Sequence, residues 1–148
     1  MIKFTIIFAS TCFLLFGFSL KQNNVKLVEA TSEKWISGQN GGGSGTEYFM
    51  KIKILTDQKI VFDSLWFNNK SLPTYLSQTN SSISSEPVSF VKNDIVVVRV
   101  SDLSSSANKI IKPPLKYKGE GILRYFVNGK AFYLIIKKFK QIPSINRP

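Results

Sequence analysis

The sequence contains no histidine and only one cysteine, Cys12, among its 148 residues. Without histidine the chain cannot form a Ser-His-Asp triad, and with a single cysteine it cannot close an intramolecular disulfide. Zinc and copper sites built from imidazole and thiolate ligands are excluded for the same reason. The composition therefore predicts a protein without a metal or cofactor, whose fold is stabilised by burial of apolar side chains.

Acidic residues are also scarce, with 9 Asp and Glu against 20 Lys and Arg, and the net charge is +11. The sequence places no two carboxylates so that they would act as acid and base across a glycosidic bond, although two could still meet in the folded chain. We therefore expect a protein that is not an enzyme, with a carboxylate-based glycosidase as the alternative.

The N-terminus has the pattern of a secretory signal peptide. After Lys3, an apolar run of about 15 residues begins, which is shorter than the roughly 20 residues that a membrane-spanning helix needs. Gly17 and Ser19 supply the small side chains that cleavage requires. We expect residues 1–19 to be removed and the protein to reach the periplasm, the outer envelope or the extracellular space. Membrane anchoring through an uncleaved segment is the alternative.

The rest of the chain lacks an extended helical period and instead alternates apolar and polar residues in short stretches separated by polar turns. About seven or eight such strands favour an all-β, antiparallel two-sheet sandwich, with an immunoglobulin-like sandwich as one arrangement. We expect a lead-in with short strands and a glycine-rich loop at 20–45, a sandwich core at 46–140 and a C-terminal tail at 141–148.

The first long strands are predicted at 47–55 and 59–67. Because only the short polar segment 56–58 lies between these strands, we expect a hairpin in which Asp63 lies opposite Lys53. One face of this hairpin should enter the core, and it carries Tyr48, Met50, Ile52, Ile54, Phe62 and Trp66. The stretches 71–87 and 101–114 have loop composition, whereas the apolar run 95–100 predicts a strand inside a sheet.

A second hairpin is centred on Asn128-Gly129, the dipeptide that best fits a two-residue type I′ turn. Pairing outward from this turn places Val127 opposite Lys130 and Arg124 opposite Tyr133. We expect a cation–π contact between Arg124 and Tyr133 on one face of the hairpin. The other face should be core, with Leu123, Tyr125, Phe132, Leu134 and Ile136.

The stretch GQNGGGSG, residues 38–45, lacks the lysine and the following helix of a phosphate-binding loop. The residues after it have the alternation of a strand. We therefore expect a tight turn after Trp35, with positive φ at one or more glycines, and no nucleotide binding.

Positive charge is concentrated between Lys109 and Pro148, which contain ten basic residues and a single acidic residue, Glu120. Such a cluster favours an anionic partner, although a solvated basic face without a ligand is also consistent with it. We expect an exported, non-catalytic β-domain that binds an anionic envelope polymer or lipid surface, while nucleic acid is not favoured. The candidate anion-binding residues are Arg124, Lys137, Lys138 and Lys140.

The alternative function is an interaction subunit that docks on another envelope protein through a strand edge or an aromatic patch. Trp66 and Tyr133 are the candidate aromatic contacts, but tryptophan in a strand is also a common core residue.

Several motifs resemble those of a group of small, uncharacterised exported bacterial proteins of β type, some of them lipoproteins. The motifs are EKWISGQNGGGSGTEYFMKI, FDSLWF, DIVVVRV and PPLKYKGEGILRYFVNGKAFYLIIKKF, which together span most of residues 33–139. The resemblance implies a location in the cell envelope and no particular activity. The chain differs from lipidated members because Cys12 lies inside the apolar run and not at its end.

Overall fold

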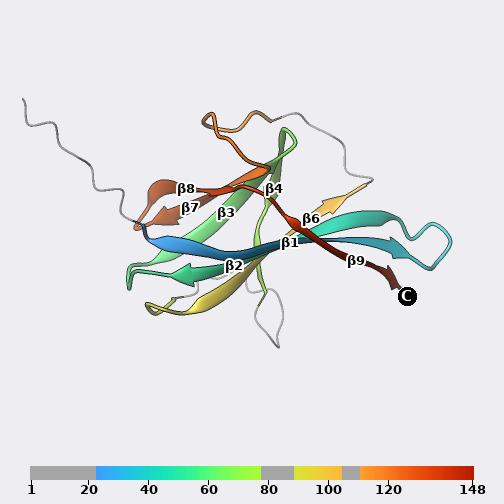
Figure 1. Ribbon diagram of the computed structural model, residues 1–148, viewed down its shortest axis with the longest axis horizontal. Helices are drawn as coiled ribbons and strands as arrows, with labels where there is room; N and C mark the ends of the chain where they lie inside the picture. Colours follow the sequence, from blue (N-terminus) through green and yellow to red (C-terminus); the bar gives the residue numbers. More distant parts are fainter. Residues whose placement is uncertain (1–22, 78–88, 105–110) are drawn as a thin grey trace, which may run out of the picture.

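The computed structural model describes residues 23–77, 89–104 and 111–148, which form strands and connecting turns without a helix (Figure 1). The signal-peptide prediction for residues 1–19 lies outside these ranges. The strands are β1 (Val25–Ser37), β2 (Ser44–Ile54), β3 (Ile60–Phe67), β4 (Lys70–Pro73), β5 (Tyr75–Ser77), β6 (Ile95–Leu103), β7 (Gly121–Val127), β8 (Lys130–Ile136) and β9 (Lys140–Arg147).

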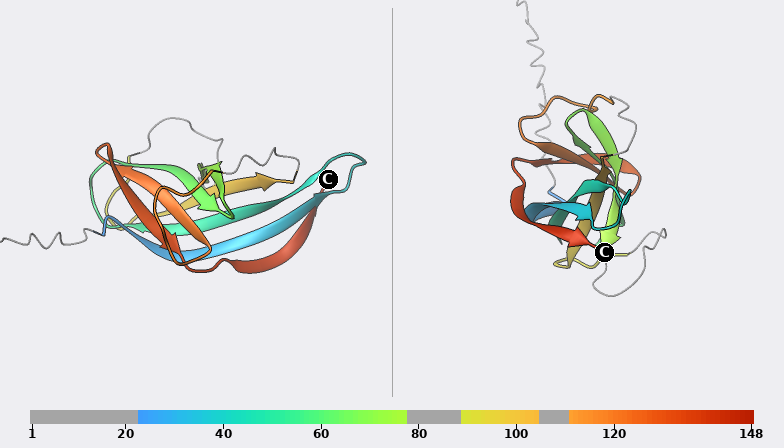
Figure 2. Two further views of the ribbon diagram at one scale, coloured as in Figure 1. Left: turned by 90° about the horizontal axis from the view of Figure 1, so that it is seen from above. Right: turned by 90° about the vertical axis from the view of Figure 1, so that its right-hand side faces the viewer.

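The strands form two sheets that pack against each other, which confirms the predicted all-β, two-sheet architecture. One sheet has the order β5-β6-β2-β1-β9 and the other has the order β4-β3-β7-β8. All neighbours are antiparallel except β1 and β9, which run parallel. The β1–β2 hairpin extends beyond the four-stranded sheet, and the C-terminus lies near its tip (Figure 2). Part of the inner face of the five-stranded sheet is therefore not covered by the opposite sheet.

The core lies between the sheets and takes the predicted face of β2. Met50, Ile52 and Ile54 are fully buried, and Tyr48 is nearly so. Each such side chain contributes roughly 1.5–3 kcal/mol by leaving water. They pack with residues of β6 and of the opposite sheet, chiefly Val98, Val100, Leu65, Leu123, Tyr125 and Ile136.

The β7–β8 hairpin has the predicted register, from Val127 opposite Lys130 to Gly121 opposite Ile136. Asn128 and Gly129 both have positive φ, at 48° and 80°, as a type I′ turn requires. Asparagine and glycine tolerate these angles better than other residues, and so the dipeptide determines the register of the whole hairpin.

The predicted hairpin between the first two long strands is wrong. β2 belongs to the five-stranded sheet and β3 to the four-stranded sheet, so residues 55–59 cross between sheets and Asp63 does not pair with Lys53. Asp63 instead accepts a hydrogen bond of 2.7 Å from Nε of Arg124 on β7. Alternation identified the buried face of β2, but it carried no information about the neighbouring strand.

A bulge in β3 also changes which aromatic residue enters the core. Phe62 pairs with Tyr125 and Ser64 with Arg124, so Asp63 is an extra residue that shifts the alternation by one. Leu65 is therefore the fully buried core residue, while Trp66 lies on the opposite face of the sheet, beneath Arg124.

The ends of the sandwich differ from the predicted segment boundaries. Residues predicted as a C-terminal tail form β9, and the lead-in contains the 13-residue strand β1, which lies between β2 and β9. β4 and β5 fall largely within a stretch predicted as loop, residues 71–87. The predicted strand at 95–100 is confirmed as β6, which is flanked by β2 and β5.

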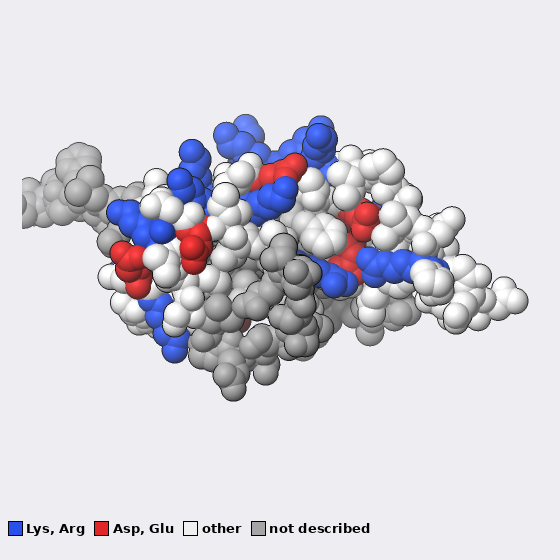
Figure 3. Space-filling model, turned by 90° about the horizontal axis from the view of Figure 1, so that it is seen from below, with Lys and Arg blue, Asp and Glu red and all other residues white. Residues whose placement is uncertain are grey.

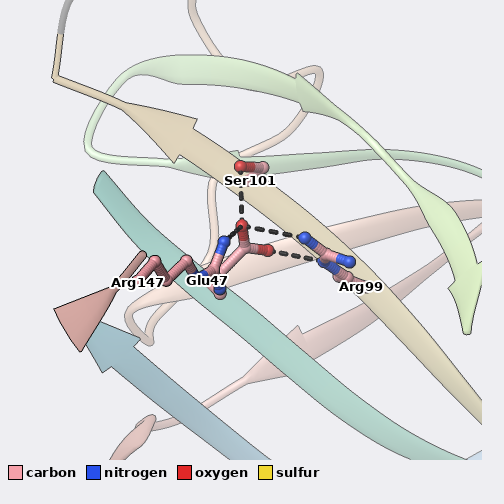
Figure 4. A network of polar contacts seen from close by, with 4 residues as sticks. All are labelled: Glu47, Arg99, Ser101 and Arg147. Atoms are coloured by element: carbon pink, nitrogen blue, oxygen red, sulfur yellow. Dashed lines mark hydrogen bonds and ion pairs between the residues drawn. The ribbon is translucent and has the colours of Figure 1, made fainter. Parts of the chain in front are cut away.

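The buried carboxylate of Glu47 helps to hold β9 in the five-stranded sheet (Figure 4). Glu47 on β2 is 1% exposed, and its side chain points away from the four-stranded sheet because it alternates with Tyr48. Arg99 on β6 donates two hydrogen bonds to it, at 2.7 and 3.0 Å, and the Ser101 hydroxyl donates a third at 3.0 Å. Arg147 on β9 reaches across β1 to the same carboxylate, 3.5 Å from Oε1.

Arg147 makes two further contacts that hold the end of β9. Its guanidinium lies 4.8 Å from the ring centre of Trp35 on β1, and its carbonyl accepts a hydrogen bond of 2.7 Å from the Gly38 amide. The Glu47 network thus connects β6, β2 and β9 across β1.

Glu47 is ionised in the folded protein. Burial acts to raise the pKa of its carboxyl, but the hydrogen bonds from Arg99 and Ser101 and the charges of Arg99 and Arg147 lower it below the ordinary value of 4.5. Because the folded-state pKa lies below that of the unfolded chain, this stabilisation is present above pH 4.5 and disappears as the pH falls through the folded-state pKa.

The glycine-rich stretch is the turn of the β1–β2 hairpin, as predicted. Gly41 and Gly43 have φ values of 82° and 78°. The amide of Ser37 donates a hydrogen bond of 3.0 Å to the Gly43 carbonyl, which closes the turn. At Gly45 a side chain would collide with β6, because its Cβ would lie 2.8 Å from the Asp102 carbonyl oxygen and 2.9 Å from Nε1 of Trp35.

Gly45→Val should therefore lower the free energy of unfolding by about 1–3 kcal/mol through overpacking, and Gly43→Val should lower it through backbone strain. Urea denaturation measures both changes. Gly38→Ala is the control, since its Cβ would make an ordinary contact of 3.5 Å with the Arg147 carbonyl oxygen. Valine variants as stable as the wild type would show that the stretch is a spacer.

Glu47→Gln should lower the free energy of unfolding at neutral pH by about 2 kcal/mol, because it removes the charge from the bonds to Arg99. Since the glutamine does not titrate, the variant should also lose less stability than the wild type when the solution is acidified. Urea denaturation from neutral to acidic pH tests this. The control is Glu29→Gln, which removes an exposed partner of Lys51. Equal acid sensitivity of Glu47→Gln and the wild type would contradict the assignment.

Candidate functional site

The four predicted anion-binding residues do not form one patch. Arg124 lies on the outer face of the four-stranded sheet, where it pairs with Asp63, and its guanidinium stands 4.9 Å from the Trp66 ring centre and 5.5 Å from that of Phe126. The lysines at 137, 138 and 140 follow β8 and lead into β9. Because a carboxylate compensates its charge, Arg124 is not an open anion site.

The two predicted aromatic contacts also lie on the outer face of the four-stranded sheet. Tyr133 is the register partner of Arg124, as predicted, but the Arg124 guanidinium lies over Trp66 and Phe126 instead of Tyr133. Trp66 is 5% exposed and therefore offers no open ring face to a ligand, whereas Tyr133 is partly exposed.

A groove of about 1020 Å³ opens where the chain passes from β8 to β9. Residues of β1 and β2 form one side, the end of β3 and the residue before β7 form another, and β9 completes the wall. The overhang of the five-stranded sheet produces this space, because side chains there face the opposite sheet without being covered by it.

Three lysines line the groove: Lys34 on β1, Lys138 before β9, and Lys140 on β9. Lys138 and Lys140 are two of the predicted residues; Lys137 is exposed but does not line the groove. Within the described ranges, none of the three groove lysines forms an ion pair with a carboxylate. All three lysines are exposed to solvent.

Glu120 is the one carboxylate among the groove-lining residues. Its Oε2 accepts a hydrogen bond of 2.7 Å from the Phe139 amide, so this charge also positions the backbone between Lys138 and Lys140. Glu29 pairs with Lys51 at 2.8 Å, and the hydrogen bond and charge of Lys51 lower the pKa of Glu29. The charge of Lys140 lowers this pKa further. Acidic groups thus compensate the groove lysines only in part.

Charged side chains of both signs occur on the surface of the protein. On the face drawn in Figure 3, lysine and arginine side chains gather along the upper margin, and acidic side chains lie among them. The net charge of the chain therefore does not by itself identify a binding surface.

The floor of the groove is aromatic. The ring centre of Tyr48 lies 4.8 Å from that of Phe67 and 4.9 Å from that of Phe139. Burial, followed by the negative charges of Asp102 and Glu120, raises the pKa of Tyr48 to about 12. Its hydroxyl is therefore uncharged at neutral pH and can donate or accept a hydrogen bond.

Neutral polar side chains surround this floor. Those that line the groove are Ser32, Thr46, Asn68, Gln141 and Ser144. Together with the lysines they offer donors for oxygen atoms on an anionic ligand and acceptors for its hydroxyl groups.

The groove lacks the arrangement that acid-base hydrolysis of a glycoside needs. Both geometries of that reaction use a pair of carboxyl groups, and the lining contributes only Glu120, which already holds the Phe139 amide. In the described ranges there is no group of three or more acidic, histidine or cysteine residues that could hold a metal ion.

Comparison with known proteins adds no constraint on the function. No protein-family model matches the chain, and no curated protein or solved structure is significantly similar to it. The described residues also include no helix with the length and hydrophobicity that crossing a membrane requires.

Sequence reasoning missed the part of the groove that comes from the N-terminal half, especially Lys34, Thr46 and Tyr48. These residues lie beside Lys140 only because β9 pairs in parallel with β1, from Thr31 opposite Lys140 to Ser37 opposite Arg147. The sequence predicted short strands in this lead-in, but it did not indicate their partner strands.

Arg124→Met should lower the free energy of unfolding by about 1–2 kcal/mol, because it removes both the ion pair with Asp63 and the cation–π contact with Trp66. Its retention on an anionic resin should match that of Lys112→Met, an exposed single-charge control. Denaturation and salt elution measure the two effects. A large loss of retention by Arg124→Met alone would restore this residue as an anion site.

Proposed function

We propose that this chain is an exported, non-catalytic β-domain that binds an anionic component of the cell envelope through the groove at the β8–β9 junction. The observation that carries the proposal is the set of three lysines on an open groove, without an ion-pair partner among the described residues. The aromatic floor and the neutral polar rim support binding of a ligand rather than simple solvation of a charged face.

Export rests on the N-terminal residues 1–19, whose charged start, short apolar run and small residues have the pattern of a cleavable signal. The absence of disulfide-forming cysteines in the predicted mature chain is compatible with export, because the two-sheet core is well buried. The partner therefore belongs to the anions of the envelope, namely acidic polymers and lipid headgroups.

The strand order also supports the immunoglobulin-like arrangement. Sandwiches of that type place strands A, B, E and D in one sheet and C, F and G in the other. Here β1, β2, β6 and β5 occupy the first set of positions, and β3, β7 and β8 occupy the second, with β4 added beside β3. β9 is an additional strand, and it supplies one wall of the groove.

A salt-elution experiment on an immobilised anionic polymer, heparin-agarose, tests the proposed site. Lys138→Glu with Lys140→Glu should elute at much lower salt than the wild type, because charge attraction from the groove is reversed and salt screens what remains. Thermal denaturation verifies that the variant is folded.

The matched control is Lys112→Glu with Lys137→Glu, which changes the net charge equally at exposed positions that do not line the groove. It should elute close to the wild type. Equal elution of the two double variants would mean that retention follows net charge alone, and the proposal would then fail.

A further inference from the structure

The shape and lining of the groove distinguish among anionic ligands. Its floor is recessed: Tyr48 and Phe139 line it but are only 5% and 4% exposed. A flat bilayer would rest on the rim and leave this floor unfilled, whereas a single polymer chain can lie within a groove of about 1020 Å³. Typical small-molecule pockets have at most about this volume, roughly 300–1,000 Å³.

The aromatic rings are not arranged for nucleobases. Single-stranded nucleic acids bind when bases stack on exposed aromatic faces along a basic channel. Here Tyr48 packs against Phe67 and Phe139, and the nearly complete burial of Tyr48 and Phe139 leaves little ring surface. Phe67 is partly exposed and offers one apolar contact, which matches the C–H face of a sugar ring better than a series of bases.

The polar lining matches a ligand with many hydroxyl groups. Three cations occur together with five neutral hydrogen-bonding side chains, among them Thr46 on β2 and Gln141 on β9. A polyphosphate would use the lysines and leave most neutral acceptors unpaired. A sugar chain with carboxylates uses both sets, because its hydroxyls donate to the neutral oxygens while its anions pair with the lysines.

We infer that the groove binds one chain of an acidic polysaccharide, with Lys34, Lys138 and Lys140 pairing with its carboxylates and Thr46 and Gln141 bonding to its hydroxyls. This inference rests on the proposed function and narrows it to one class of anion. β1, β2 and β9 line one side of the groove, and Phe67, Asn68 and Glu120 line the other. The hydrogen bond from the Phe139 amide to Glu120 holds the backbone between Lys138 and Lys140.

Isothermal titration calorimetry with short polygalacturonate chains tests the inference, with dextran as a neutral polysaccharide. Polygalacturonate should bind and dextran should not bind measurably. Thr46→Val with Gln141→Leu should weaken polygalacturonate binding about tenfold, a loss of about 1.4 kcal/mol, without altering net charge. Elution of the same variant at nearly wild-type salt from a synthetic sulfonate resin, which carries no sugar hydroxyls, would show that general anion attraction is intact.

Vesicles of phosphatidylglycerol and a single-stranded oligonucleotide serve as competing anions. Binding of either that depends on Lys138 and Lys140, with no binding of polygalacturonate, would overturn the polysaccharide inference and leave the anion-binding function in place. If the Lys138→Glu, Lys140→Glu variant and the Lys112→Glu, Lys137→Glu control eluted from heparin-agarose at the same salt concentration, both the anion-binding function and the polysaccharide inference would be overturned. Unchanged polygalacturonate affinity in the Thr46, Gln141 variant would overturn the role of the hydroxyl contacts.

Discussion

The buried charge of Glu47 is the constraint on which the arrangement of the five-stranded sheet depends. An ionised carboxylate inside a protein is costly unless hydrogen bonds compensate it, and here Arg99, Ser101 and Arg147 provide that compensation from strands on both sides. Because Arg147 belongs to β9, satisfying Glu47 also holds the last strand against β1. A shift of β9 along β1 would separate Arg147 from both Glu47 and the Trp35 ring.

The groove is a consequence of this attachment. Residues 137–139 cross from β8 in the four-stranded sheet to β9 in the five-stranded one, and this crossing brings Lys138 and Lys140 to the groove that Lys34 also lines. The β1–β2 hairpin extends beyond the four-stranded sheet (Figure 2), and its residues Lys34 and Thr46 line the groove beside the aromatic floor. The proposed binding site thus depends on a parallel strand pair and on a sheet that is longer than its partner.

The sequence predicted those structural features that depend on residues close together in the chain. Asn128-Gly129 determined the β7–β8 register, and alternation identified Tyr48, Met50, Ile52 and Ile54 as core residues. Partners far apart in sequence were not predictable, because alternation defines a face and not a neighbour. The crossing after β2, the bulge at Asp63 and the pairing of β9 with β1 all belong to this second class. As a result, Lys138 and Lys140 were identified as candidates, while Lys34 and the groove floor were missed.

We propose above all that an acidic chain occupies the groove at the β8–β9 junction. The most direct measurement is a nitrogen-15 NMR titration of the folded protein with short polygalacturonate chains, which reports on each backbone amide. The account predicts shifts concentrated at Ser32, Lys34, Thr46 and residues 138–144. Shifts confined to the outer face of the four-stranded sheet, around Arg124 and Tyr133, would contradict it.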